Sequence, residues 1–247
     1  MLSHTSGYPP YQPKGNPVDK YQTLAESVAH ILPLPPAHPP GERFDYGGLA
    51  MQVAGRMAEV AAGQNWETIF QERIAEPCRM KNTHFTPVDQ GGGHSPMLGG
   101  GACSNLRDYA NFLSMIFNGG RFDGNRVLSE KAVREMQADQ LRGAFVNQPE
   151  FPARVRGTKH DAIYGLGEWR EELDAHGDAV LISSPSWAGA YPWIDKTTSV
   201  YGVIIAHVGA PGVGRDHFSG FYSSPELAVL VREVIAKSVP DQPKTSP

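Results

Sequence analysis

Hydrophobic residues recur every three or four positions in two adjoining stretches of the first third of the chain. The first stretch carries apolar side chains at Met51, Val53, Ala54, Met57, Val60 and Ala61. The second stretch, Trp66–Ala75, repeats the spacing and is followed by Pro77. This period matches a helical turn, Gly63 is a typical helix end, and proline cannot continue a helix. The pattern therefore predicts two consecutive amphipathic helices.

Four further helices are predicted from apolar spacing combined with capping residues. They cover Val18–Ile31, Leu106–Asn118, residues 130–140 and Pro225–Ser238. Asn105 and Ser129 stand where a side-chain oxygen would cap the second and third of these helices. Pro225 suits a first helical position, because its fixed φ already matches the helix.

The hydrophobic pattern changes after Tyr164. Four short segments rich in aromatic and β-branched residues follow, at 164–172, 179–184, 190–195 and 200–208. Polar turn clusters separate them, which is typical of antiparallel strands. The predicted order is helices, then three or four strands, then a closing helix, so we expect an α+β fold. We divide this single domain into a mainly helical region, 1–160, and a region of antiparallel sheet with the C-terminal helix, 161–247.

Composition and charge exclude several classes of protein. The chain has 247 residues, of which 40% are hydrophobic, and this is enough for a packed core. Its formal charge is −4 and like charges form no block, so we predict no nucleic-acid partner. No run of roughly 18 apolar residues predicts a membrane span. The first residues also lack the basic start and apolar run of a signal peptide.

Cysteines and histidines show no disulfide or metal pattern. Cys78 and Cys103 are the two cysteines, and neither belongs to a CxxC pair. The nine histidines show no H-x-x-x-H or H-E-x-x-H spacing. The glycine-rich stretch 91–101 lacks the Lys-Ser/Thr of a phosphate-binding loop. We therefore predict neither a metal nor a cofactor.

Six segments of the chain, taken in order, resemble one family. The segments are LSHTSGY at 2–8, the stretches 39–63, 67–85 and 99–120, YGLGEW at 164–169, and 189–207. They are similar to the motifs of the β-lactamase-like serine hydrolases, which include class C β-lactamases, D-Ala-D-Ala peptidases and related bacterial esterases. The resemblance implies that family's fold, a helical region beside an antiparallel sheet, here without the N-terminal strands.

The resemblance also implies acylation of a serine, which needs a nucleophile, a base and donors for the oxyanion. In the family the nucleophile lies in a Ser-x-x-Lys motif upstream of the HTSG loop, and this chain begins at that loop. No serine in the sequence has a lysine three residues later, and no G-x-S-x-G elbow is present. We therefore expect the later two-thirds of a serine hydrolase, truncated at the N-terminus and inactive alone.

The second family motif, Tyr-x-Asn, resembles Tyr46-Gly47-Gly48. The resemblance makes Tyr46 the catalytic residue of this chain, as proton acceptor or relay for the serine. Gly48 stands at the substrate-binding position where the family usually has asparagine. Loss of that amide argues against β-lactam substrates and favours the esterase or amidase branch, because a hydrogen bond to the substrate would go unmade. The alternative interpretation is that Tyr46 only packs against the helix entrance.

The third family motif is a strand segment, Lys-Thr-Gly in β-lactamases and His-x-Gly or Trp-x-Gly elsewhere. Spacing places it at Ser184-Pro185-Ser186, whereas a literal match selects Trp187-Ala188-Gly189. The candidate substrate-binding residues are therefore Ser184, Ser186, Trp187 and Gly189. Both choices lack the cation that would attract a substrate carboxylate, which again argues against penicillins. Alternatively, the two serines are only polar residues of an edge strand.

Two other functions remain open at this point. The chain could keep the family pocket as a binding or interaction module without catalysis, or a serine such as Ser184 or Ser186 could have become the nucleophile. The expected partner is a small ester or amide. We also expect self-association, because a sheet without its N-terminal strands would present an unpaired edge.

Overall fold

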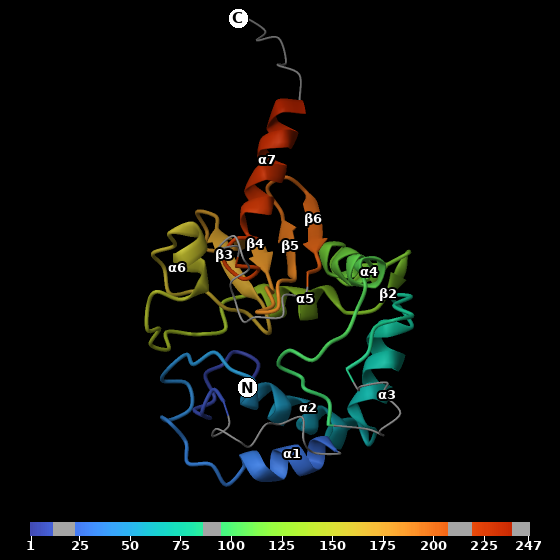
Figure 1. Cartoon of the computed structure of the whole chain (residues 1–247), viewed down its shortest axis with the longest axis vertical. Helices are drawn as coiled ribbons and strands as arrows, with labels where there is room; N and C mark the ends of the chain where they lie inside the picture. Colours follow the sequence, from blue (N-terminus) through green and yellow to red (C-terminus); the bar gives the residue numbers. More distant parts are fainter. Residues whose placement is uncertain (12–22, 86–94, 207–218, 239–247) are drawn as a thin grey trace, which may run out of the picture.

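The computed structural model describes residues 1–11, 23–85, 95–206 and 219–238. Its helices are α1 Leu24–Ile31, α2 Leu49–Ala62, α3 Trp66–Phe70, α4 Leu106–Phe117, α5 Glu130–Gln137, α6 Phe151–Arg156 and α7 Glu226–Ser238. Its strands are β1 Arg121–Phe122, β2 Asn125–Arg126, β3 Trp169–Leu173, β4 Ala179–Ser183, β5 Tyr191–Asp195 and β6 Val200–Ile204. Helices α1 and α2 lie at one end of the molecule, and the sheet β3–β6 lies towards the other (Figure 1).

The predicted helix boundaries follow from local capping. The Asn105 side chain accepts a hydrogen bond from the backbone N–H of Asp108, and Ser129 caps α5 in the same way. Helix α2 ends at Gly63, whose φ of +67° is the left-handed conformation that glycine adopts without strain. These predictions are confirmed. The predicted start of the first helix, residues 18–22, lies outside the described residues.

Three local features differ from the sequence prediction. The predicted helix Trp66–Ala75 is α3 followed by a π-helical turn, η2 Gln71–Ala75, so its hydrogen bonds change register. Helix α6 and the short hairpin β1–β2 lie in stretches for which we predicted no element. Residues 164–168 form a turn, because the Gly165 N–H donates to the Glu168 carbonyl, and β3 starts only at Trp169.

The larger sheet is antiparallel, with the strand order β3-β4-β5-β6. Alternate side chains of β5 face opposite ways: Tyr191 and Trp193 join the cluster beneath α7, and Ile194 joins the cluster beneath α4. Helix α4 packs against β5 and β6, while α7 begins beside the sheet and extends past the strand ends (Figure 1). The element order confirms the predicted α+β class.

Ion pairs, buried at Arg156 and half-buried at Arg232, fasten α6 and α7 to the sheet. The Arg156 guanidinium lies 2.7 Å from a carboxylate oxygen of Glu171, and it also donates to the Pro225 carbonyl at the start of α7. Arg232 of α7 binds Asp195 at 2.5 Å and Glu172 at 2.8 Å. Because each guanidinium contacts groups from different elements, the pairs fix the position of α7 relative to the sheet.

Candidate functional site

Two segments far from each other in sequence build the surroundings of Tyr46. The His4 carbonyl accepts a hydrogen bond from the Asp45 N–H at 2.9 Å, and the Thr5 carbonyl accepts one from the Gly41 N–H at 2.7 Å. On the other side, the Phe44 N–H donates to the Phe145 carbonyl at 2.9 Å. The chain around Tyr46 is therefore held between the N-terminal loop and the segment before α6.

The Tyr46 ring is half-buried in an aromatic cluster. Its centroid lies 4.6 Å from that of His4, 5.0 Å from that of Trp169 and 6.0 Å from that of Tyr164. Burial raises the pKa of Tyr46 to about 12. At neutral pH the side chain is therefore a neutral phenol, which can accept one hydrogen bond and donate another.

His4 is a site residue that the sequence analysis missed as an individual, although it lies in the HTSG-like segment. It is only 4% exposed. Its Nδ1 accepts a hydrogen bond from the Gly47 N–H at 3.3 Å, and its Nε2 lies 3.2 Å from the Tyr164 hydroxyl. Burial, and secondarily the nearby terminal ammonium, lower the pKa of His4 to about 3, so the ring is neutral.

The two glycines after Tyr46 have different surroundings. A Cβ on Gly47 would lie 2.1 Å from the Pro10 carbonyl oxygen, so a side chain does not fit there. A Cβ on Gly48 would meet nothing within 4 Å, and its φ of −84° suits any residue. The Gly48 backbone is instead approached by Gly99, whose Cβ would lie 2.8 Å from the Gly48 Cα. Gly48 therefore opens onto free space, at the position where the resemblance puts asparagine.

The other sequence candidates lie in or beside the turn between β4 and β5. The Ser186 N–H donates to the Ala190 carbonyl at 2.7 Å, and the Ser186 hydroxyl accepts from the Ala188 N–H at 3.2 Å. Gly189 has a φ of +114°, and a Cβ on Gly220 would lie 2.2 Å from the Gly189 Cα. Ser184 is exposed, and its hydroxyl donates to a backbone carbonyl at 3.4 Å. The Ser186 hydroxyl is thus part of the turn.

Trp187 projects from this turn and is 50% exposed. Its ring lies 5.3 Å from Phe221, which lies 4.8 Å from Phe151. Phe151 in turn lies 5.5 Å from Trp169, the ring that packs on Tyr46. A continuous aromatic layer therefore joins the two groups of candidates. Within the described parts of the chain, no hydrogen bond links Tyr46 to Ser184 or Ser186.

A β-lactamase family model matches residues 1–217 of the chain. The chain belongs to the β-lactamase family. A β-lactamase-designated protein of Bacteroides dorei has a similar solved structure, with 52% sequence identity and a TM-score of 0.89 over 95% of this chain and 71% of that protein. The predicted β-lactamase and penicillin-binding-protein-like fold is confirmed.

Two further relatives of this β-lactamase-family chain come from other bacteria. Protein Rv1367c of Mycobacterium tuberculosis is 26% identical over 93% of the chain. The D-alanyl-D-alanine-carboxypeptidase/endopeptidase AmpH of Escherichia coli is 29% identical over 77% of the chain. The alignments cover 66% of the length of Rv1367c and 52% of the length of AmpH.

Glu168, like His4, is a buried ionisable residue that the sequence analysis missed. It is 8% exposed, and its Oε1 has no hydrogen-bond partner among the described residues. Burial raises its pKa to about 8, although the charges of Lys196 and Arg170 oppose the shift. Burial, followed by electrostatic interaction with Tyr46 and then with Glu168, raises the pKa of Tyr164, which contacts His4. A protonated carboxyl group therefore lies beside the aromatic cluster at neutral pH.

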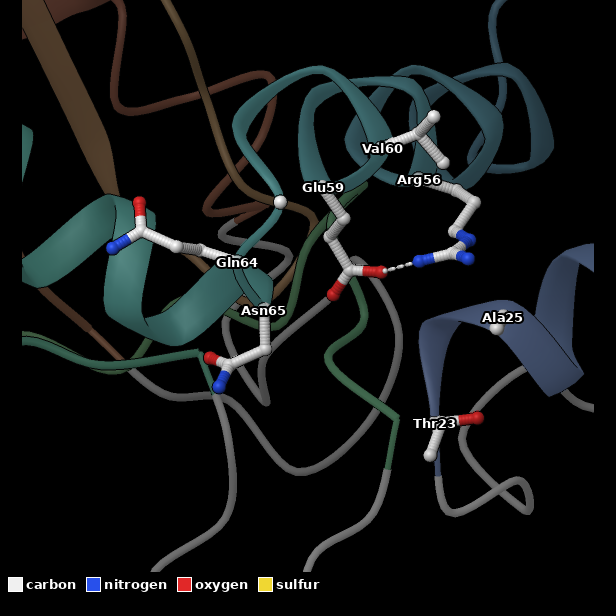
Figure 2. A pocket seen from close by; sticks show the side chains of 8 residues that line it. Thr23, Ala25, Arg56, Glu59, Val60, Gln64 and Asn65 are labelled. Carbon is white, nitrogen blue, oxygen red and sulfur yellow. Dashed lines mark hydrogen bonds and ion pairs between the residues drawn. The ribbon is translucent and has the colours of Figure 1, made fainter.

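A shallow hollow of about 460 Å³ lies away from these candidates, between α1 and the junction of α2 with α3 (Figure 2). Its charged groups are already paired: Arg56 binds one Glu59 oxygen at 2.9 Å, and the backbone N–H of Trp66 donates to the other at 2.8 Å. The residues that line it are Thr23, Ala25, Arg56, Glu59, Val60, Gly63, Gln64 and Asn65. None of the predicted site residues belongs to it.

Within residues 1–11, 23–85, 95–206 and 219–238, no three His, Cys, Asp or Glu side chains gather as a metal site would require. No helix in the same residues is long and apolar enough to cross a membrane.

Proposed function

We propose that this chain is the tyrosine-bearing part of a β-lactamase-family serine hydrolase of the esterase or amidase branch. The observation that carries the proposal is the placement of Tyr46. Its neutral phenol is held by aromatic contacts on several sides, and the residue two positions later, Gly48, opens onto free space. A substrate carbonyl could approach the phenol from that space.

The proposed role of Tyr46 is proton transfer during acylation of a serine. The serine hydroxyl loses its proton to the Tyr46 oxygen as its oxygen bonds to the substrate carbonyl carbon, and the Tyr46 proton passes to a second base. The carbon–oxygen or carbon–nitrogen bond to the leaving group then breaks, and the second base gives the proton to the departing alcohol or amine. The phenol is regenerated, so the step balances without a free phenolate. No serine followed by lysine at the third position is available within the sequence to supply nucleophile and base. The chain by itself is therefore proposed to be inactive.

The proposed substrate is a small ester or amide without a carboxylate that must be paired. Gly48 supplies no amide, and the turn from Ser184 to Gly189 carries no cation. The half-exposed ring of Trp187 instead offers an apolar surface for an acyl or leaving group. β-Lactams are therefore proposed to be poor substrates.

An activity assay tests this proposal directly. We expect the chain alone to hydrolyse neither p-nitrophenyl acetate nor nitrocefin above the uncatalysed rate, and its mass to stay unchanged after fluorophosphonate treatment. Stoichiometric labelling of any serine would refute the proposed inactivity and identify that serine as the nucleophile.

A completed protein tests the role of Tyr46. Joining an upstream segment that carries Ser-x-x-Lys should produce ester hydrolysis, and Tyr46→Phe should then lower kcat by about 100-fold or more with little change in stability. Tyr201→Phe is the matched control, because that ring packs against Phe117 beneath α4. Equal kcat values for Tyr46→Phe and the parent protein would remove Tyr46 from the mechanism.

A binding module without catalysis is the second candidate. The exposed half of Trp187 favours it, since a large apolar side chain on a fixed turn can bind a ligand whether or not a nucleophile is present. Ligand binding by the chain alone, combined with no turnover by the completed protein, would support this alternative.

A further inference from the structure

We infer that His4 is a positioning residue that fixes the backbone of Tyr46-Gly47-Gly48 through its imidazole ring. The inference depends on the proposed function only in giving Tyr46 a part in catalysis. The contacts of His4 with its neighbours do not depend on that proposal. The ring spans two segments: Nδ1 accepts from the Gly47 N–H at 3.3 Å, and Nε2 lies 3.2 Å from the Tyr164 hydroxyl.

The hydrogen bond to Gly47 determines the tautomer of His4. A backbone N–H can only donate, so Nδ1 must be without a proton. In the neutral ring the proton is therefore on Nε2, which donates to the Tyr164 oxygen. The His4 ring thus accepts a hydrogen bond from the loop that carries Tyr46 through Nδ1, and donates one to the turn that precedes β3 through Nε2.

The backbone of His4 acts on the same loop. Its carbonyl accepts the Asp45 N–H at 2.9 Å, so bonds from His4 reach the residues immediately before and after Tyr46. His4 has a φ of +55°, a conformation that is uncommon outside glycine, although asparagine, aspartate and histidine adopt it more often than other residues. Behind the loop, Gly47 touches the Pro10 carbonyl. The backbone on each side of Tyr46 is therefore held in place, by His4 and by the Pro10 carbonyl.

Core packing alone does not account for this arrangement. An aliphatic side chain would fill the space without the cost of desolvating two ring nitrogens. His4 carries both nitrogens at 4% exposure and gives each of them one specific partner. If the ring were replaced by an apolar group, the buried Gly47 N–H would be left without an acceptor.

Two substitutions separate the functions of the ring nitrogens. The Asn Oδ1 occupies the same position along the side chain as Nδ1, whereas the Gln amide reaches the position of Nε2. His4→Asn should therefore keep the bond to Gly47, and asparagine also tolerates the positive φ. His4→Gln should keep the contact with Tyr164 and lose the bond to Gly47.

Amide hydrogen exchange measured by NMR reports on the hydrogen bond from the Gly47 N–H to His4 Nδ1 in the intact chain. In His4→Gln we expect the Gly47 amide to exchange about fivefold faster or more, relative to the Ile182 amide in the sheet, while His4→Asn stays near the parent value. The signal of the Tyr46 ring carbon bonded to oxygen should shift in His4→Gln and not in His4→Asn. His176→Asn, in the turn between β3 and β4, is the control and should change neither signal.

Measurements on the parent protein keep the inference falsifiable if a variant does not fold. Nitrogen-15 NMR should show the proton of the His4 ring on Nε2, and a proton on Nδ1 would overturn the inference. Equal Gly47 exchange in folded His4→Gln and parent protein would also overturn it. These readouts need no turnover, so they can succeed even when Tyr46→Phe leaves kcat unchanged in the completed enzyme, and the two proposals fail separately.

Discussion

Replacing the ionisable carboxyl group of Glu168 with an amide should change how the free energy of unfolding depends on pH. Its carboxyl group is buried and its folded-state pKa is raised from 4.5 to about 8. The folded protein therefore holds a proton that the unfolded chain releases at neutral pH. The stability contributed by this proton is complete below about pH 4.5 and is lost as the pH rises through about 8.

The size of the effect follows from the two pKa values. At about 1.4 kcal/mol per pKa unit, the difference between 4.5 and about 8 limits the loss to roughly 5 kcal/mol. Glutamine has nearly the same shape and no charge at any pH. We therefore expect Glu168→Gln to match the parent within about 1 kcal/mol at pH 5 and to be more stable by several kcal/mol at pH 9.

Urea unfolding at pH 5, 7 and 9, followed by circular dichroism, measures this difference. Glu42→Gln is the matched control, because it makes the same substitution at an exposed position. Parallel curves for Glu168→Gln and the parent, with the same gap at all three pH values, would refute the assignment of a protonated Glu168.

Three further outcomes are expected. Gly47→Ala should lower the free energy of unfolding by roughly 2 kcal/mol or more, because the added Cβ would meet the Pro10 carbonyl. Gly48→Asn should lower it by less than about 1 kcal/mol, because a Cβ there meets nothing within 4 Å. Thermal unfolding of the two variants measures both differences. Arg156→Met should lower the free energy of unfolding by roughly 3–5 kcal/mol, since it leaves the buried Glu171 carboxylate without its cationic partner. Urea unfolding measures the loss, and a value below about 1 kcal/mol would contradict the prediction. Light scattering after size-exclusion chromatography should show mass increasing with concentration, because β6 ends the strand order of the described sheet and apolar side chains of α7 are exposed; a constant monomer would contradict this.

The sequence was informative where a structural feature depends on neighbours in the chain. Asn105 and Ser129 cap their helices as predicted, because each side chain bonds to a backbone N–H three residues later. His4 and Glu168 could not be found in this way. The contact of His4 with Tyr164 spans 160 positions, and the burial of Glu168 results from the packing of separate elements. Their chemistry is a property of the folded environment.

Helix α6 shows a related limit of sequence reasoning. Its N-cap residue, Glu150, makes no side-chain capping bond, so it carries no strong start signal. The helix is stabilised instead by Phe151, buried against Trp169, and by Arg156, paired with Glu171. Six residues are too few to form a stable helix without such tertiary contacts.

The aromatic layer between Tyr46 and Trp187 also makes the protein its own optical reporter. Light absorbed by Tyr46 can be transferred to Trp169, whose ring lies 5.0 Å away. Trp187 is half in water, so its emission responds to quenchers and bound ligands, whereas the buried Trp169 is shielded from them. A soluble quencher would thus act on the tryptophan emission at the Trp187 end of the layer and spare that at the Trp169 end, without any attached dye.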